Sequence, residues 1–96
     1  MNPYQIIKRP VVTEKATQLA DEQNTYVFEV DRRANKIEIK KAIEAIYGVH
    51  VEKVRVVNVK PKRGRWGRRT ITRKPAWKKA YVKVREGEKI QIFEGV

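Results

Sequence analysis

Apolar and polar residues alternate with a period of two along parts of this 96-residue chain. In 25–30, TYVFEV, the side chains of Tyr26, Phe28 and Val30 share one side of an extended backbone, and Thr25 and Glu29 lie on the other. This alternation predicts a half-buried β-strand. The stretch AYVKV at 80–84 repeats the pattern and predicts a second strand.

Other stretches are apolar or β-branched without a regular alternation. Residues 49–59 predict a strand, and the parity of its valines shifts part-way, which indicates a bulge near Glu52 or Lys53. The shorter apolar runs at 4–8 and 90–93 are each predicted to form a strand.

Two stretches have helical spacing. Thr13 is a suitable N-cap for a helix over 14–21. A second helix is predicted between Asn35, which with Glu38 resembles a capping box, and Gly48, a residue suited to a helix C-terminus. The apolar stripe of this second helix consists of Ile39, Ala42, Ile43 and Ile46.

The length suits one domain, 1–96, with a single modest core. Strands and helices in this mixture predict a small α/β domain. Residues 60–79 lie between two predicted strands, so we interpret them as the long arm of a hairpin. Segments of this length between elements of a small domain are usually functional or disordered.

The charge of the chain is concentrated in this arm. The net charge is +12, and 60–79 contains ten lysines and arginines with no acidic residue. The other 76 residues carry 13 basic and 11 acidic side chains, a net charge of only +2. A local field of this kind attracts a polyanion, either a nucleic acid or an anionic membrane surface.

Missing residue types exclude most enzymatic chemistry. The chain has no cysteine and no serine, and its single histidine, His50, cannot build a multi-histidine metal site, so we expect a surface residue there. No nucleophile constellation, metal motif or phosphate-binding glycine loop is present, and no cofactor is indicated. The carboxylates of Asp21, Glu22, Glu29 and Asp31 have no spacing that favours a nuclease metal over solvated turns.

The arm itself has the chemistry of an RNA contact. Gly64 and Gly67 permit turns and a close approach of backbone to phosphate. Trp66, between a basic residue and a glycine, is predicted to contact nucleic acid. For Trp77 two interpretations remain. A large aromatic side chain at the start of a strand can pack on the sheet, and it can equally stack on a base.

Four stretches in order resemble a known family. They are RPVVTEKA at 9–16, NKIEIKKAIEAIYGVHVEKV at 35–54, KRGRWGRR at 62–69 and WKKAYVKV at 77–84. Together they closely resemble the bacterial form of the large-subunit ribosomal protein L23 family, over essentially the whole chain. The pattern departs at Arg55, because members usually have Asn-Thr after the strand valine, and an arginine there can contact a phosphate instead.

The resemblance implies an α/β/α sandwich around a small antiparallel sheet, with the basic hairpin extended into ribosomal RNA. It implies a structural constituent of the large ribosomal subunit, cytoplasmic and ribosome-bound, that binds rRNA beside the nascent-chain exit tunnel. The implied partners are large-subunit rRNA, neighbouring ribosomal proteins at the tunnel rim, the nascent polypeptide, trigger factor and the signal recognition particle.

Site residues follow from the same resemblance. Glu14, in the family's S/T-E-K motif, is expected to belong to the docking site for trigger factor, and it also suits the positive end of a helix dipole. From the body, Lys15 and Lys36 are expected to touch rRNA. The expected rRNA contacts of the arm are Lys60, Lys62, Arg63, Arg65, Trp66, Arg68, Arg69, Arg73, Lys74, Lys78 and Lys79.

Two alternatives remain at this point. A free-standing RNA or DNA chaperone would use the same arm, since counterion release attracts it to any nucleic acid. A peripheral membrane protein is the weaker alternative, because the basic block lacks an apolar helical face that would insert into a bilayer. The N-terminal residues contain no long apolar run, so neither a signal peptide nor a membrane span is expected.

Overall fold

The computed structural model describes residues 2–66 and 69–92, and for 62–66 and 69–74 it describes the backbone alone. The elements in chain order are α1 (Pro3–Ile6), β1 (Ile7–Pro10), α2 (Glu14–Gln23), β2 (Thr25–Val30), α3 (Lys36–Tyr47), β3 (Val51–Val59), β4 (Lys62–Trp66), β5 (Arg69–Lys74) and β6 (Trp77–Val84).

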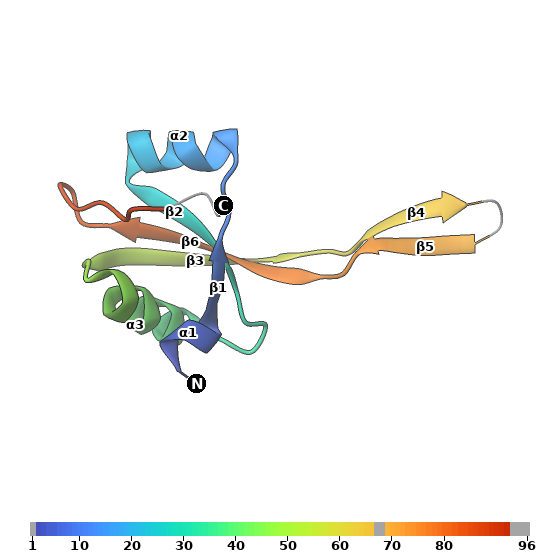
Figure 1. The fold of residues 1–96 in the computed structure, drawn as a ribbon, viewed down its shortest axis with the longest axis horizontal. Helices are drawn as coiled ribbons and strands as arrows, with labels where there is room; N and C mark the ends of the chain where they lie inside the picture. Colours follow the sequence, from blue (N-terminus) through green and yellow to red (C-terminus); the bar gives the residue numbers. More distant parts are fainter. Residues whose placement is uncertain (1, 67–68, 93–96) are drawn as a thin grey trace.

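Four of the strands form the sheet of the body, in the order β1-β2-β6-β3 with every neighbouring pair antiparallel. Helices α1 and α3 pack together on one side of this sheet, and α2 lies on the other side, over β2 (Figure 1). The fold is therefore α+β with helices on both sides of an antiparallel sheet, which confirms the expected fold class.

The main core lies between α3 and the sheet. Alternate residues of β2 and β6 point into it, among them Phe28 and Val82, which are fully buried. Ile39 and Ile43 of α3 meet them from the helix side, also at 0% exposure. The period-two pattern of the strands and the stripe on the helix thus face each other across one interface, as the sequence predicts.

Both predicted helices begin at their capping residues, and α3 also ends as Gly48 indicates, whereas α2 continues two residues past the predicted end, to Gln23. The Thr13 side chain accepts a hydrogen bond from the Ala16 N–H at 3.1 Å, at the start of α2. At α3, the Asn35 side chain accepts from Glu38 N–H at 2.9 Å, and the Glu38 carboxylate accepts from Asn35 N–H at 3.2 Å. Gly48 closes α3 with φ +66°, a left-handed conformation that favours glycine.

The predicted strand at 4–8 is confirmed for its last two residues and wrong for the others. Residues Pro3–Ile6 form the single helical turn α1, and β1 starts only at Ile7. Asn2 and Gln5 form a capping box around this turn, and Pro3 occupies its first position, where a missing N–H is harmless. Local capping therefore overrides the strand preference of a short apolar run.

The predicted strand at 90–93 is wrong for its described part as well. Residues 90–92 have no strand pairing, although Ile90 is only 5% exposed and belongs to the core. Ile90 and Ile92 are apolar because they pack against the core. A side chain can be buried in this way without its backbone pairing with another strand. Phe93 lies outside the described residues.

The predicted bulge in β3 is confirmed, since the register against β6 shifts between Val51 and Lys53. His50 precedes this strand and is exposed, as expected, but it has a partner. Its ring Nδ1 lies 2.7 Å from the Glu88 carboxylate, which also accepts the His50 backbone N–H. These two hydrogen bonds lower the pKa of Glu88 and tie the turn after β6 to the start of β3.

Candidate RNA-binding interface

The basic arm continues directly from the two strands at its root. Val59, the last residue of β3, pairs with Trp77, the first residue of β6. Beyond them β4 and β5 pair with each other from Lys62↔Lys74 to Trp66↔Arg69, with one register shift near the root. The arm projects away from the body (Figure 1), and the molecule measures 52 × 30 × 26 Å along its principal axes.

Most of the predicted arm contacts fall where the backbone alone is described. Seven of them lie in β4 or β5, so their side chains are outside the described part: Lys62, Arg63, Arg65, Trp66, Arg69, Arg73 and Lys74. Arg68 lies outside the described residues. The structure shows how the backbone of these seven residues is arranged. Antiparallel pairing of β4 with β5 places them on one narrow two-stranded ribbon.

At the root of the arm the predicted contacts separate onto two sides. Lys60 is exposed just beyond β3. The Lys79 ammonium lies 5.4 Å from the centre of the half-buried Trp77 ring, a cation–π contact. Lys78 points the other way, and its ammonium donates a hydrogen bond to the backbone carbonyl of Ala34. The neighbouring lysines of WKKA therefore differ, since Lys78 already has a partner within the body.

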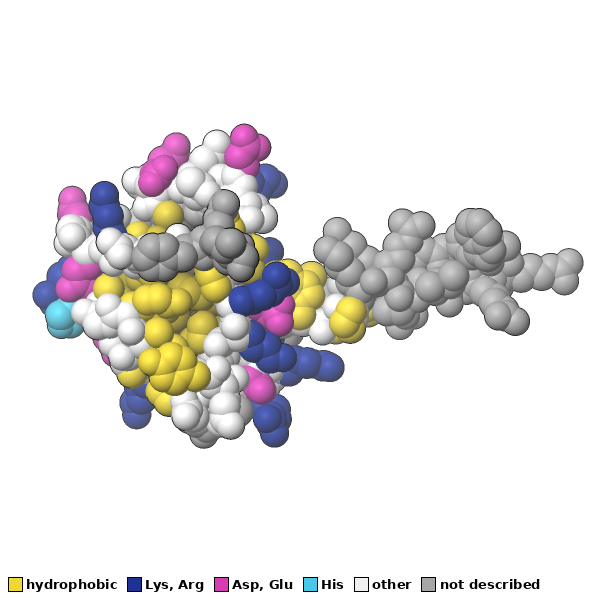
Figure 2. All heavy atoms as spheres, in the orientation of Figure 1, with side chains coloured by type: hydrophobic (Ala, Val, Ile, Leu, Met, Phe, Trp, Pro, Cys, Tyr) yellow, Lys and Arg dark blue, Asp and Glu magenta, His cyan; other side chains and the backbone are white. Residues whose placement is uncertain are grey.

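The two predicted contacts on the body are both exposed. Lys15 lies in the first turn of α2, and Lys36 is the first residue of α3. These helices occupy opposite sides of the sheet, so the two lysines belong to different layers of the fold. Figure 2 shows further Lys and Arg side chains gathered on the part of the body from which the arm emerges.

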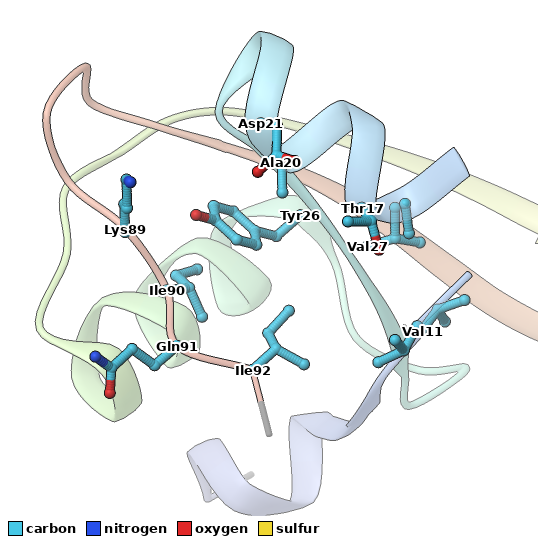
Figure 3. Close-up of a pocket in the computed structure, with 12 residues that line it drawn as sticks. Val11, Thr17, Ala20, Asp21, Tyr26, Val27, Lys89, Ile90, Gln91 and Ile92 are labelled. Atoms are coloured by element: carbon cyan, nitrogen blue, oxygen red, sulfur yellow. The ribbon is translucent and has the colours of Figure 1, made fainter. Parts of the chain in front are cut away.

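Glu14 lies beside an apolar hollow of the body. It is exposed at the first position of α2, where a carboxylate faces the positive end of the helix dipole. Val12, two residues earlier, is 43% exposed and lines a cavity of about 360 Å³ between α2, β2 and the C-terminal segment (Figure 3). Tyr26 and Ile92 line the same cavity.

Metal-ligating side chains do not cluster in the part of the chain that the structure describes. No group of three or more His, Asp or Glu side chains among them is close enough to hold a metal ion. In the same part of the chain, no helix is long and apolar enough to cross a membrane. Of the four carboxylates expected in solvated turns, only Asp31 lies at a turn, and hydrogen bonds from Arg33 lower its pKa. Asp21 and Glu22 lie in α2 and Glu29 lies in β2, so the expectation is wrong for these three.

Sequence comparisons place this chain in a family. The sequence model of ribosomal protein L23 matches residues 5–92. The chain belongs to the ribosomal protein L23 family. Similar proteins, each named large ribosomal subunit protein uL23, come from Caldicellulosiruptor saccharolyticus, Syntrophus aciditrophicus and Geobacter sulfurreducens.

These relatives match over nearly their full length. The first is 56% identical over 97 residues, covering 100% of this chain and 99% of the relative. The second is 53% identical, with 97% and 96% covered, and the third 49% identical, with 98% and 99% covered. Membership confirms that the chain is a structural constituent of the large ribosomal subunit and not an enzyme, with the expected cytoplasmic, ribosome-bound location.

Proposed function

We propose that this L23-family chain binds large-subunit rRNA mainly through its basic arm, beside the nascent-chain exit tunnel. One observation carries the proposal: of the ten basic residues in 60–79, eight lie between β3 and β6, in the arm that the fold projects away from the body, and Lys78 and Lys79 lie at its root. A ribbon with this charge cannot pack on its own body, which carries a net charge of only +2 over 76 residues. It needs a polyanion around it, and rRNA supplies one.

Each predicted contact has a physical role in this proposal. Guanidinium groups such as those of Arg63 and Arg65 donate paired hydrogen bonds to phosphate oxygens, and lysines add compact charges. Trp66 stacks on an unpaired base or lies against a ribose. Lys60 and Lys79 extend the contact to the arm's root, where both strands are fixed by pairing. Lys15 and Lys36 anchor separate rRNA segments on the two sides of the body.

We place the body at the tunnel rim, on the grounds of family membership, with neighbouring ribosomal proteins and the nascent polypeptide as further partners. The docking of trigger factor, and of the signal recognition particle at the same rim, is assigned to the region around Glu14. Exposure of Val12 beside the apolar hollow supports this assignment. An apolar side chain next to a carboxylate gives a protein partner both a hydrophobic contact and an orienting charge.

Sedimentation of a tagged copy of the chain tests the proposal. Ribosomes are washed in about 0.5 M salt, at which contacts between exposed charges are largely screened, and separated on a sucrose gradient. We expect the chain to stay with the large subunit in one copy each. Complete release into the light fractions would contradict an integrated rRNA contact and would favour a free-standing RNA chaperone.

Removing the Glu14 carboxylate is expected to affect docking and leave assembly intact. In a Glu14→Ala variant we expect normal incorporation into the large subunit and weaker recruitment of trigger factor, by about tenfold or less, as for a charge at an interface rim. The measurement is trigger factor binding to purified mutant ribosomes. Glu22→Ala, at the exposed far end of α2, is the matched control. Normal binding by the Glu14 variant would remove this residue from the docking site.

A further inference from the structure

We propose a second RNA-binding surface on the open face of the sheet, where one unpaired nucleotide enters a hollow beside Tyr81. The surface, called here the open face, consists of Lys53, Arg55, Lys79, Tyr81 and Lys83. The proposal rests on the proposed function, since it names a further site for the same RNA. The new site adds the stacking of a base on an aromatic ring, a contact that the positive charge of the arm does not supply.

Strand register places these side chains together. Lys53 pairs with Lys83, Arg55 with Tyr81, and both pairs belong to the antiparallel ladder between β3 and β6. Directly opposed residues of such a ladder project from the same side of a sheet. Ala80 and Val82, which alternate with them, are 0% exposed in the core. The open face is therefore the side turned away from α3.

Helix α2 leaves this face largely uncovered. It packs over β2, where Ala16 and Val27 are both buried, and stops short of β3. Lys53, Arg55 and Lys83 are exposed, and Tyr81 is half-buried. An aromatic ring in a row of cations on an uncovered sheet is the arrangement with which sheet-based RNA-binding domains hold unstacked bases.

Between α2 and β3 the face is hollowed to the size of a small ligand. The cavity has a volume of about 390 Å³. Its floor contains the Tyr81 ring, and Leu19 of α2 forms an apolar wall. Polar groups for the edge of a base come from Gln23, the last residue of α2, and Thr25, the first residue of β2. A planar base would thus meet one aromatic surface, one apolar wall and hydrogen-bonding groups.

The cations around the ring are already held in place. The Arg55 guanidinium carbon lies 6.0 Å from the centre of the Tyr81 ring, and the Lys79 ammonium lies 5.6 Å from it. Such contacts reduce the side-chain freedom that binding would otherwise remove. Arg55 and Lys79 therefore lie over the ring, and a base that stacks there displaces a cation from the ring face toward the phosphates that flank the bound base.

Acidic groups beside the open face do not cancel its charge. Glu29 lies opposite Lys79 in the β2–β6 register, and its carboxylate accepts a hydrogen bond from Arg9 Nε at 3.0 Å. Glu14 borders the neighbouring cavity that Lys79 and Tyr81 also line. Glu52 lies beside Lys53 at the bulge of β3, and Lys15 lines the same neighbouring cavity as Glu14. Five cations against three carboxylates leave the face positive, which favours an RNA strand over an acidic or neutral peptide.

Continuity with the arm also favours RNA. The two strands that carry the open face are the ones that lead into the arm, with Trp77 and Lys79 at the junction. An RNA held along the arm would therefore pass the open face without a break in positive charge. This places the hollow where an unpaired nucleotide of the same RNA can reach it.

Paired substitutions in the full-length chain test the charges of the open face. We expect Arg55→Gln with Lys83→Gln to make the plot of log affinity for protein-free large-subunit rRNA against log salt shallower by roughly 1.4, from about 0.7 for each single-strand phosphate contact. The matched control is Lys40→Gln with Lys41→Gln, two exposed lysines on α3. Equal slopes for both pairs would overturn the proposal.

Substitutions of Tyr81 test the stacked base. Tyr81→Phe keeps the ring and is expected to bind as wild type. Tyr81→Leu keeps apolar volume without the aromatic plane and is expected to lose about 5- to 150-fold in affinity, the range for one stacked base, at an unchanged salt slope. Thermal unfolding of both variants checks that the body is intact. Equal affinity of folded Leu and Phe variants would show that no base stacks there.

The two proposals fail in different ways. If the wild-type chain showed no preference for large-subunit rRNA over unrelated RNA of equal length, the proposed function itself would fail. If the wild type binds selectively and arm variants weaken it, while open-face variants match their controls, only the second surface is refuted.

Discussion

Neutralising four arginines of the arm is expected to release the chain from rRNA. In the variant Arg63→Gln, Arg65→Gln, Arg69→Gln and Arg73→Gln the net charge falls from +12 to +8. Because each lost phosphate contact removes one released counterion, the salt dependence of binding should become shallower by roughly 3. A wild-type chain with six to ten such contacts should lose about three to five decades in affinity between 50 and 200 mM salt.

A control variant with the same net charge separates the effect of where the charges lie from the effect of the net charge. Lys40, Lys41, Arg85 and Lys89 are exposed on α3 and on the turn after β6, away from the arm (Figure 1). Changing all four to glutamine also gives +8 and should alter the salt slope little. If both quadruple variants lost the same affinity, the positive field of the whole chain, and not the arm, would hold the RNA.

Truncating the most enclosed aromatic side chain of the core is expected to bring the protein close to unfolding. Phe28 is 0% exposed on β2, an inner strand, and its ring centre lies 5.7 Å from that of Tyr47 on α3. Phe28→Ala should cost about 3–5 kcal/mol, since the sheet and α3 cannot close fully over the space left. Stabilities of small domains are about 5–15 kcal/mol, so the loss is a large part of the total.

Thermal unfolding followed by circular dichroism measures this effect, with an expected fall in melting temperature on the order of 15 °C or more. Ile37→Ala on α3 is the control, because that side chain is 66% exposed and its truncation should change stability by about 0.5 kcal/mol or less. A Phe28→Ala protein as stable as the control would mean that the interface between α3 and the sheet does not carry the fold.

Local chemistry explains which elements the sequence predicts well. The caps of α2 and α3 are decided by single side chains within three residues, so Thr13, Asn35 and Gly48 locate the helix ends without tertiary information. The parity shift of the valines likewise reveals the bulge before Lys53. The strand predicted at 4–8 starts only at Ile7, and the strand predicted at 90–93 is wrong for its described residues, because a short apolar run shows that a segment is buried, not which of its residues pair in a ladder.

The residues of the candidate site also fall into those that the sequence predicts and those that only the fold distinguishes. The density of charge in 60–79 is visible in the chain itself and marks the arm as the candidate RNA contact independently of the fold. Resemblance to L23 then supplies Glu14, for which charge and spacing give no signal beyond a helix dipole. The difference between Lys78 and Lys79 needs the fold, because strand alternation sends adjacent side chains to opposite sides of a sheet and only packing decides which side is covered.

By itself, then, the sequence determines the family, the capped helices, the core-facing positions and the charge of the arm, because each depends on residues close together in the chain. The tertiary structure alone decides the open face. Arg55 and Tyr81 are 26 positions apart, and they meet because β3 and β6 pair in one particular register while α2 settles over β2. Register and layer order are set by the packing of the whole core, which no local pattern encodes.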